Sequence, residues 1–261
     1  MMFAMIVVAL NFNACGGDDE ENSIGNNYTI TDGKKLSQIT FDKAGGTCSF
    51  HYDAQGRLVE WHESTITYKV SNITYKDGYI LTDDGKLFLL NGRIVKYDNV
   101  EFIYDNDYLI EIRNNEEDVS KQLVLNFSWD NGNLVKIEFK THTHFDLYTI
   151  DYSNYTCSSY LVNTILVPFL LYVPVEVLER SIIRSFMINA FGKRSRYLIS
   201  RINLIRYYNG SKYEEYDYDF KWTMDKGLPV IMTETIKVTS YYWEPISFYE
   251  RENYKYTFDW E

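Results

Sequence analysis

Short turns of similar composition recur along this chain, and they constrain its fold more than any other feature. Each turn places Asp, Asn or Gly ahead of a returning aliphatic residue; the turns lie at residues 32–36, 52–58, 84–87, 91–94, 104–109, 129–134 and 222–228. Gly and Asn adopt the positive φ that tight hairpin turns require, and Asp tolerates it while bonding its own backbone. The sequence therefore predicts a series of β-hairpins.

The segments between the turns alternate as half-buried strands do. In residues 216–222 and 254–260, aromatic rings occupy every second position and charged or polar residues lie between them. Such a strand has one aromatic face and one wetted face. The chain holds 24 Tyr and only 4 Pro, a mixture that favours strands over helices.

Aromatic residues also mark a longer period. They occur in steps of 23, 29, 25 and 23 residues, at Tyr52, Tyr75, Tyr104, Trp129 and Tyr152. Each step has room for two strands and two turns, so we interpret the pattern as an internal repeat. Residues 28–261 are expected to form a single all-β domain, an antiparallel meander of repeated hairpins that makes a barrel or a strongly curved sheet.

The N-terminal residues predict export and a lipid anchor. Residues 3–12 form an apolar run too short to span a bilayer, Ala14 is the small residue that a peptidase needs, and residues 1–14 are the expected signal peptide. Cys15 then becomes the lipidated first residue of a flexible acidic tether, residues 15–27. The alternative is an ordinary secretory peptide with an incidental cysteine, because no Lys or Arg precedes the apolar run.

Two families resemble parts of this sequence. The acidic leader after Cys15 resembles the lipoproteins of Bacteroidetes, in which it accompanies display on the cell surface. The Tyr-Asp-Ala-Gln-Gly-Arg-Leu segment at 52–58 resembles the YD repeat of Rhs-type proteins. The whole layout resembles an uncharacterised Bacteroidetes lipoprotein family (the DUF4595 type) described as having a porin-like β fold. This last resemblance implies an antiparallel barrel or curved sheet, and no known activity.

One segment, residues 160–192, departs from the strand pattern. Pro174 suits a first helical turn, apolar residues recur at helical spacing after it, and Gly192 suits the end, so we expect an amphipathic helix at about 174–191. It either fills or caps one opening of the β structure, or serves as a lid or docking element.

Charge and cysteine content limit the partners. The formal net charge of −11 opposes binding to nucleic acid and to anionic headgroups. An oxidising exterior permits Cys48 and Cys157 to pair; the other interpretation is two isolated thiols. With alternating charges on the strands, no continuous lipid-facing apolar band is expected, so the lipid would be the membrane attachment of a barrel that is not inserted.

Residues suited to catalysis or metal binding are few. His142, His144 and Asp146 have ligand-like spacing on a strand, but no second cluster completes a coordination sphere, so a solvated strand face is the default and no metal or cofactor is predicted. The sequence contains no nucleophile elbow and no phosphate loop. We expect no enzyme activity, although 37 carboxylates leave a carboxylate-based hydrolase open.

Tryptophan and tyrosine residues supply the ligand-binding candidates. Most Trp residues are interpreted as core anchors of hairpins. Tyr241, Tyr242 and Trp243 are consecutive, so they point to both faces of the sheet and can form a platform for a sugar ring or a peptide. Two hypotheses follow: a non-enzymatic binding module for an extracellular glycan or protein, or a structural lipoprotein that docks onto an outer-membrane partner. Either would be lipid-anchored at the outer membrane, on its periplasmic or cell-surface side.

Overall fold

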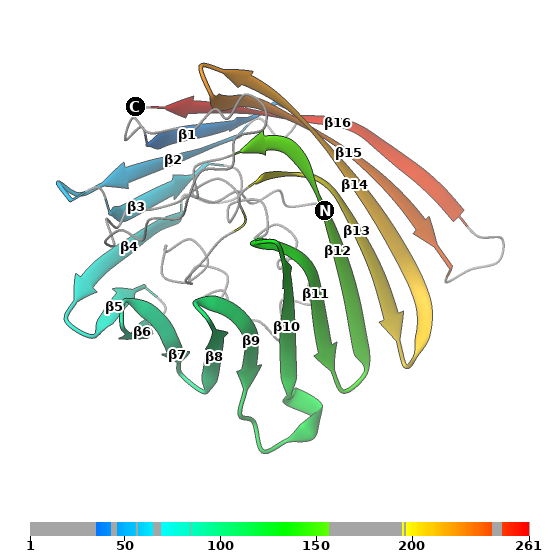
Figure 1. Ribbon diagram of the computed structural model, residues 1–261, viewed down its shortest axis with the longest axis horizontal. Helices are drawn as coiled ribbons and strands as arrows, with labels where there is room; N and C mark the ends of the chain where they lie inside the picture. Colours follow the sequence, from blue (N-terminus) through cyan, green and yellow to red (C-terminus); the bar gives the residue numbers. More distant parts are fainter. Residues whose placement is uncertain are drawn as a thin grey trace.

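The computed structural model describes residues 35–42, 46–55, 57–64, 69–83, 85–156, 195, 197–241 and 247–260. Sixteen strands in this part of the chain form one closed antiparallel barrel, in which each strand pairs with its neighbours in sequence and β1 closes on β16 (Figure 1). The predicted all-β meander is confirmed, and the closure decides between a barrel and an open sheet. Among the described residues, no helix is long and apolar enough to cross a membrane.

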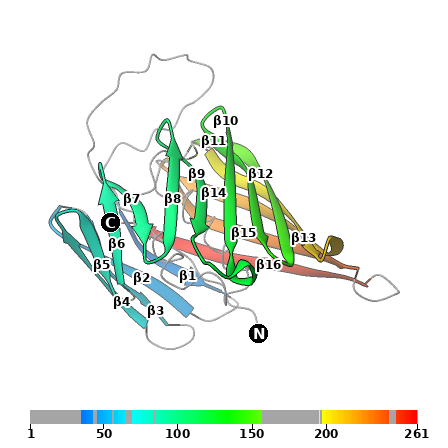
Figure 2. The same cartoon turned by 90° about the horizontal axis from the view of Figure 1, so that it is seen from below.

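The strands fall into groups of different length. The first eleven are β1 (Leu36–Phe41), β2 (Gly46–Tyr52), β3 (Leu58–Glu63), β4 (Lys69–Lys76), β5 (Tyr79–Thr82), β6 (Gly85–Leu90), β7 (Arg93–Tyr97), β8 (Val100–Asp105), β9 (Tyr108–Asn114), β10 (Leu123–Asp130) and β11 (Asn133–Thr141). A single 3-10 turn, η1 (Val119–Lys121), precedes β10. The longer strands are β12 (His144–Thr156), β13 (Tyr197–Tyr208), β14 (Ser211–Asp225), β15 (Leu228–Ser240) and β16 (Ser247–Trp260). We call β4–β7 the short-strand wall and β12–β16 the long-strand wall (Figures 1 and 2).

The predicted turns adopt the backbone that their residues favour. Both central residues have positive φ in the predicted turns Asn91-Gly92, Asn106-Asp107, Asn131-Gly132 and Lys226-Gly227, and also in Asn209-Gly210, a turn that was not predicted. Two consecutive positive φ values give the twist that matches a right-handed hairpin, which explains the Asn-Gly pairs. The turn chemistry thus fixes where each strand ends.

The barrel interior is apolar. Buried side chains from all sixteen strands form one hydrophobic cluster, which can only lie inside a closed ring of strands. Ile112, Phe139 and Ile202 are among its fully buried members. On each strand the residues that alternate with the buried ones face outward. Transmembrane barrels have the reverse arrangement, with an apolar band outside.

Aromatic anchors join successive hairpins at one end of the barrel. In each case a Tyr hydroxyl or Trp indole N–H donates a hydrogen bond of 2.6–3.1 Å to a backbone carbonyl of the preceding hairpin; the pairs are Tyr52–Leu36, Tyr75–Leu58, Tyr104–Ile94, Trp129–Leu109, Tyr152–Leu134, Trp222–Ile199 and Trp260–Pro229. The acceptors are aliphatic residues or Pro229 at the start of a returning strand. We call this end of the barrel the anchor rim.

The anchors correct one detail of the sequence period. The 29-residue step from Tyr75 to Tyr104 contains strands β5–β8, four strands where two were expected. The missing anchor position is Leu89. It pairs with Ile94 on the following strand beside a register shift, as Tyr52 pairs with Leu58 and Tyr104 with Leu109. Leucine has no polar tip, so the aromatic spacing alone could not reveal the extra hairpin.

The predicted helix at about 174–191 and its flanking segment lie outside the described residues, as do residues 1–34. The helix, the signal peptide and the tether therefore stay predictions. Trp129, Trp222 and Trp260 pack against the core and donate to backbone carbonyls, in agreement with their interpretation as hairpin anchors.

Candidate functional site

The end of the barrel opposite the anchor rim concentrates polar side chains on the long-strand wall. Strand β12 begins there, β13 ends, β14 begins and β15 ends, so residues near 144, 206, 214 and 240 lie side by side in the sheet. We call this end the polar rim. Its outward and inward side chains form two separate groups, because successive residues of a strand face opposite sides.

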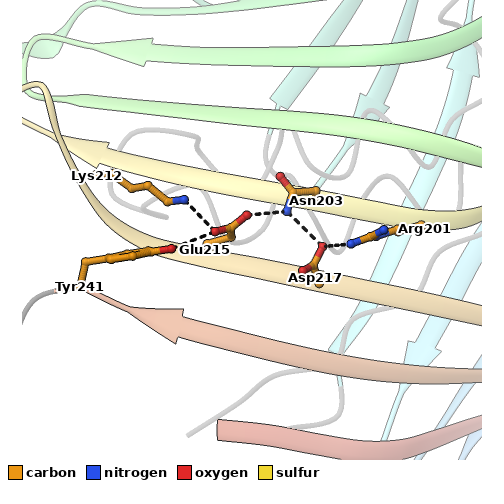
Figure 3. A network of polar contacts seen from close by, with 6 residues as sticks. All are labelled: Arg201, Asn203, Lys212, Glu215, Asp217 and Tyr241. Carbon is orange, nitrogen blue, oxygen red and sulfur yellow. Dashed lines mark hydrogen bonds and ion pairs between the residues drawn. The ribbon is translucent and has the colours of Figure 1, made fainter. Parts of the chain in front are cut away.

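The outward group is a continuous network of polar contacts (Figure 3). It consists of Arg201, Asn203, Lys212, Glu215, Asp217 and Tyr241. Arg201 donates to Asp217 at 2.7 Å, and the Asn203 amide donates to Asp217 at 3.0 Å and to Glu215 at 3.1 Å. We call these six residues the outer network. Five of them lie on β13 and β14, and Tyr241 directly follows the end of β15.

Glu215 is the centre of the outer network. Besides Asn203, it accepts a hydrogen bond from the Lys212 ammonium at 2.7 Å and from the Tyr241 hydroxyl at 3.1 Å. The hydrogen bond from Lys212 lowers the pKa of Glu215 below its ordinary value, so the carboxylate stays ionised at neutral pH. A permanently charged acceptor with three donors holds its neighbours in fixed positions.

Tyr241 is exposed yet held in place. Its side chain is 37% exposed, its backbone N–H donates to the Tyr213 carbonyl at 2.8 Å, and the Lys212 ammonium lies 4.7 Å from the ring centroid. The ring is therefore positioned before any partner arrives, which reduces the ordering cost of binding.

A second exposed aromatic residue, Phe248, lies on the same face. It is 78% exposed and pairs across strands with Thr239, which in turn pairs with Glu215. An outward row therefore runs from the outer network to an unprotected aromatic ring. The arrangement combines aromatic surface with fixed donors and acceptors.

The inward group centres on a buried ion pair. Arg206 on β13 contacts Asp146 on β12 at 3.4 Å and Glu214 on β14 at 3.3 Å, and Tyr216 donates to Glu214 at 2.8 Å. The guanidinium also lies 5.4 Å from the ring centroid of Tyr213. We call these five residues the inner cluster. It joins three strands from inside the barrel.

Burial dominates the electrostatics of the inner cluster. Asp146 is fully buried, and burial raises the pKa of its carboxyl to about 6, against the opposing influence of Arg206. Because Asp146 has no exposed surface, it acts on the site by holding Arg206 and does not itself meet a ligand. A second buried acid, Glu234 on β15, accepts a hydrogen bond from Tyr256 at 2.6 Å, and burial raises its pKa to about 7.

The predicted metal candidates do not converge. His142 is exposed in the turn before β12, while the His144 ring lies 2.9 Å from the Thr143 hydroxyl and 5.0 Å from the Tyr208 ring centroid. Asp146 is paired with Arg206. In the described ranges, no group of three or more His, Cys, Asp or Glu residues is placed to hold a metal ion.

The remaining predicted site residues are only partly described. Cys48 is buried on β2. Cys157, Cys15, Tyr242 and Trp243 lie outside the described residues, so the disulfide, the lipidation and two thirds of the aromatic platform stay predictions. Of the platform, Tyr241 is shown to be exposed and tied to the outer network.

Sequence reasoning missed most of the polar rim. The pair Asp146–Arg206 is separated by 60 residues, and only the register of β12 with β13 brings it together. Lys212 and Glu215 were visible as charges on an alternating strand, the pattern of any solvated face. A sequence clue for the network was the density of carboxylates in residues 214–219, directly beside the predicted platform in the sheet.

Comparisons with known proteins inform the fold. A porin-like protein from Bacteroides uniformis ATCC 8492 superposes with a TM-score of 0.57 at 16% sequence identity, covering 87% of this chain and 96% of that one. A chain of the TcdB2-TccC3-Cdc42 complex gives a TM-score of 0.22 at 11% identity and covers 85% of this chain and 15% of that chain. No family model and no curated protein match the sequence. The first similarity agrees with the porin-like β fold that the family resemblance implied.

Proposed function

We propose that this protein is an exported cell-envelope protein, attached through Cys15, whose barrel is a non-enzymatic binding module for an extracellular glycan. The observation that carries the proposal is the exposed, pre-positioned ring of Tyr241 at the edge of the outer network. Sugars are bound by stacking on aromatic rings and by closely spaced hydrogen-bonding groups. The outer network offers both within one rigid sheet.

The chemistry of the network suits hydroxyl groups. Arg201 and Lys212 donate, Glu215 and Asp217 accept, and Asn203 can do both. A sugar hydroxyl both donates and accepts, so alternating donors and acceptors complement it. Phe248, on the same outward face, adds apolar surface for a longer chain.

The location is proposed from the leader and supported by the barrel surface. The outward positions of the long-strand wall carry charged side chains such as Asp151, Asp219 and Lys237. A surface of this kind is stable in water and costly in hydrocarbon. A lipidated tether then places the barrel beside the outer membrane, on its periplasmic or outer side.

Glycan-array binding tests the proposal. The parent protein should bind a subset of the glycans on the array. Tyr241→Ala should reduce that binding about tenfold or more, since an aromatic anchor contributes at least about 1.4 kcal/mol to the free energy of binding. Trp243→Ala should weaken it as well. Tyr155→Ala removes an exposed ring of the strand end at the opposite rim and should leave binding unchanged.

Two outcomes would contradict the proposal. Binding that persists in Tyr241→Ala would move the site elsewhere. Absence of glycan binding, together with co-purification of an outer-membrane protein, would support the structural docking role instead.

A further inference from the structure

The short-strand wall carries an apolar patch on its outer face. Leu81 on β5 and Phe88 and Leu90 on β6 are 40%, 45% and 62% exposed. The two strands pair directly, with Tyr79 opposite Phe88 and Leu81 opposite Lys86, so the three apolar side chains share one outward surface. We call these three residues the apolar patch. Such residues are costly to expose to water, and a group of them marks a contact surface.

The charged residues on strands β5–β7 are all positive. Strands β5, β6 and β7 contain no Asp or Glu. Lys86 lies across from Leu81, Lys96 lies across from Phe88, and Lys76 is exposed at the end of β4. Residues 69–98 hold five Lys or Arg and four Asp or Glu, in a chain whose net charge is −11, and Arg93 is paired with Asp107.

The nearby carboxylates lie at the margins of this surface. Asp77 and Asp83 are in turns, and Asp83 accepts hydrogen bonds from Asn72. Glu101, across the β7–β8 seam from Lys96, is also bound by Arg113 at 3.2 Å. The lysines beside the apolar patch therefore face outward from strands that carry no carboxylate, and the carboxylates lie in the turns or across the β7–β8 seam.

Phe248 shows that exposure alone does not distinguish this surface. Its ring is more exposed than any member of the apolar patch, but its sheet neighbours lead to Glu215 and the outer network, where each carboxylate is paired with a cation. Apolar and basic side chains occur together on the short-strand wall. That combination is the one by which proteins lie on anionic membranes.

We propose that the short-strand wall rests on an anionic lipid surface, with Leu81, Phe88 and Leu90 entering the headgroup boundary and Lys76, Lys86 and Lys96 beside lipid phosphates. The net charge of −11 opposes anionic headgroups over the surface as a whole, but screening confines that repulsion to within about 8 Å, so the three lysines of this face decide its attraction to lipid phosphates. Strand β6 is eight strands away from β14 in the closed ring. The contact would therefore turn the outer network away from the membrane, a property beyond the proposed glycan binding.

Vesicle sedimentation tests the charge part of the proposal. The probe is the full chain with Cys15→Ala, so that no lipid is attached, mixed with phosphatidylcholine vesicles with or without about 30% phosphatidylglycerol. The parent should favour the anionic vesicles, and added salt should weaken that preference. Lys86→Glu with Lys96→Glu should lower the anionic partition coefficient about 25-fold or more, since each lysine contributes about fivefold.

Matched variants test the apolar part. Phe88→Ser with Leu90→Ser should lower partitioning about tenfold, while Phe248→Ser should leave it unchanged. Circular dichroism and urea unfolding confirm that each variant is folded; Lys86→Gln, the mildest change, should give a decrease of about fivefold. The proposal would be overturned if the patch variants partitioned onto anionic vesicles as strongly as the parent. It would also be overturned if the parent bound neutral and anionic vesicles equally. Patch variants that lose an acidic protein partner but bind anionic vesicles as well as the parent does would overturn it as well.

Discussion

The two walls of the barrel share one architecture but differ in length, interior and surface. Strand β5 has 4 residues and β14 has 15. The short-strand wall has an apolar patch and no carboxylate in β5–β7, whereas the long-strand wall carries the outer network of paired charges and the buried acids Asp146 and Glu234. The hairpin repeat therefore specifies the closed ring, and the outward and inward substitutions on each wall specify its chemistry.

The interior difference has an energetic consequence. Side chains inside the short-strand wall, such as Ile80 and Leu87, need no partner beyond apolar contact. Inside the long-strand wall, buried charges are stable only while they are paired. Replacing one buried charged residue of the long-strand wall by a neutral residue of similar size should therefore change the stability of the barrel. The short-strand wall offers no such substitution.

The largest expected effect comes from breaking the ion pair of the inner cluster. Asp146→Leu removes the fully buried partner of Arg206 and leaves it only the Glu214 carboxylate within the inner cluster, so it should lower the free energy of unfolding by about 3–5 kcal/mol in urea titration. The double variant Asp146→Leu, Arg206→Met removes both charges and should recover much of that loss. If the double variant is as unstable as the single one, the ion pair is not what stabilises this wall.

An intermediate effect is expected at Glu234, and it depends on pH. Its carboxyl titrates near pH 7 in the folded chain and near 4.5 when unfolded, so the unfolded state releases the proton first as pH rises. Stability is therefore full below pH 4.5 and falls as pH rises through 7, by on the order of 3 kcal/mol. Glu234→Gln should remove the Glu234 part of this fall in urea unfolding between pH 4.5 and 8, and the fall from Asp146, whose pKa is raised to about 6, should remain. Glu138→Gln, on the outer face, should preserve it.

The smallest effect is expected at the anchor rim. Both walls contribute anchors to it, but the short-strand wall has the aliphatic Leu89 at one anchor position. Trp129→Phe deletes the indole N–H that donates to the Leu109 carbonyl at 2.8 Å and should cost about 1 kcal/mol. Tyr155→Phe removes an exposed hydroxyl outside the anchor series and serves as the control. Equal unfolding midpoints for parent and Trp129→Phe would show that the anchor hydrogen bonds only accompany the hairpin packing.

The sequence predicted the fold well because turn chemistry and strand alternation are local. Asn-Gly pairs and every-second aromatic residues identified the hairpins, and Tyr52, Tyr75, Tyr104, Trp129 and Tyr152 proved to be anchors with a common hydrogen bond. The turns at 84–87 and 91–94 predicted the strand that contains Leu89, but the aromatic period missed its hairpin because the anchor is aliphatic.

The candidate site was harder to predict because it depends on register. Tyr241 was singled out from consecutive aromatic residues, but its partners Lys212 and Glu215 are about 26–29 residues earlier and meet it only through the pairing of β14 with β15. The apolar patch was invisible for a similar reason. Leu81, Phe88 and Leu90 resemble core residues until the barrel shows which face each one occupies.

The central claim is that the two walls face different surroundings, and cysteine labelling tests it most directly. Phe88→Cys on β6 and Thr223→Cys on β14 place a thiol on the exposed outer face of each wall, in the full chain with Cys15→Ala. A water-soluble maleimide should label both thiols in buffer. With anionic vesicles, labelling at residue 88 should slow severalfold while labelling at 223 stays unchanged; equal rates at both positions would contradict the account.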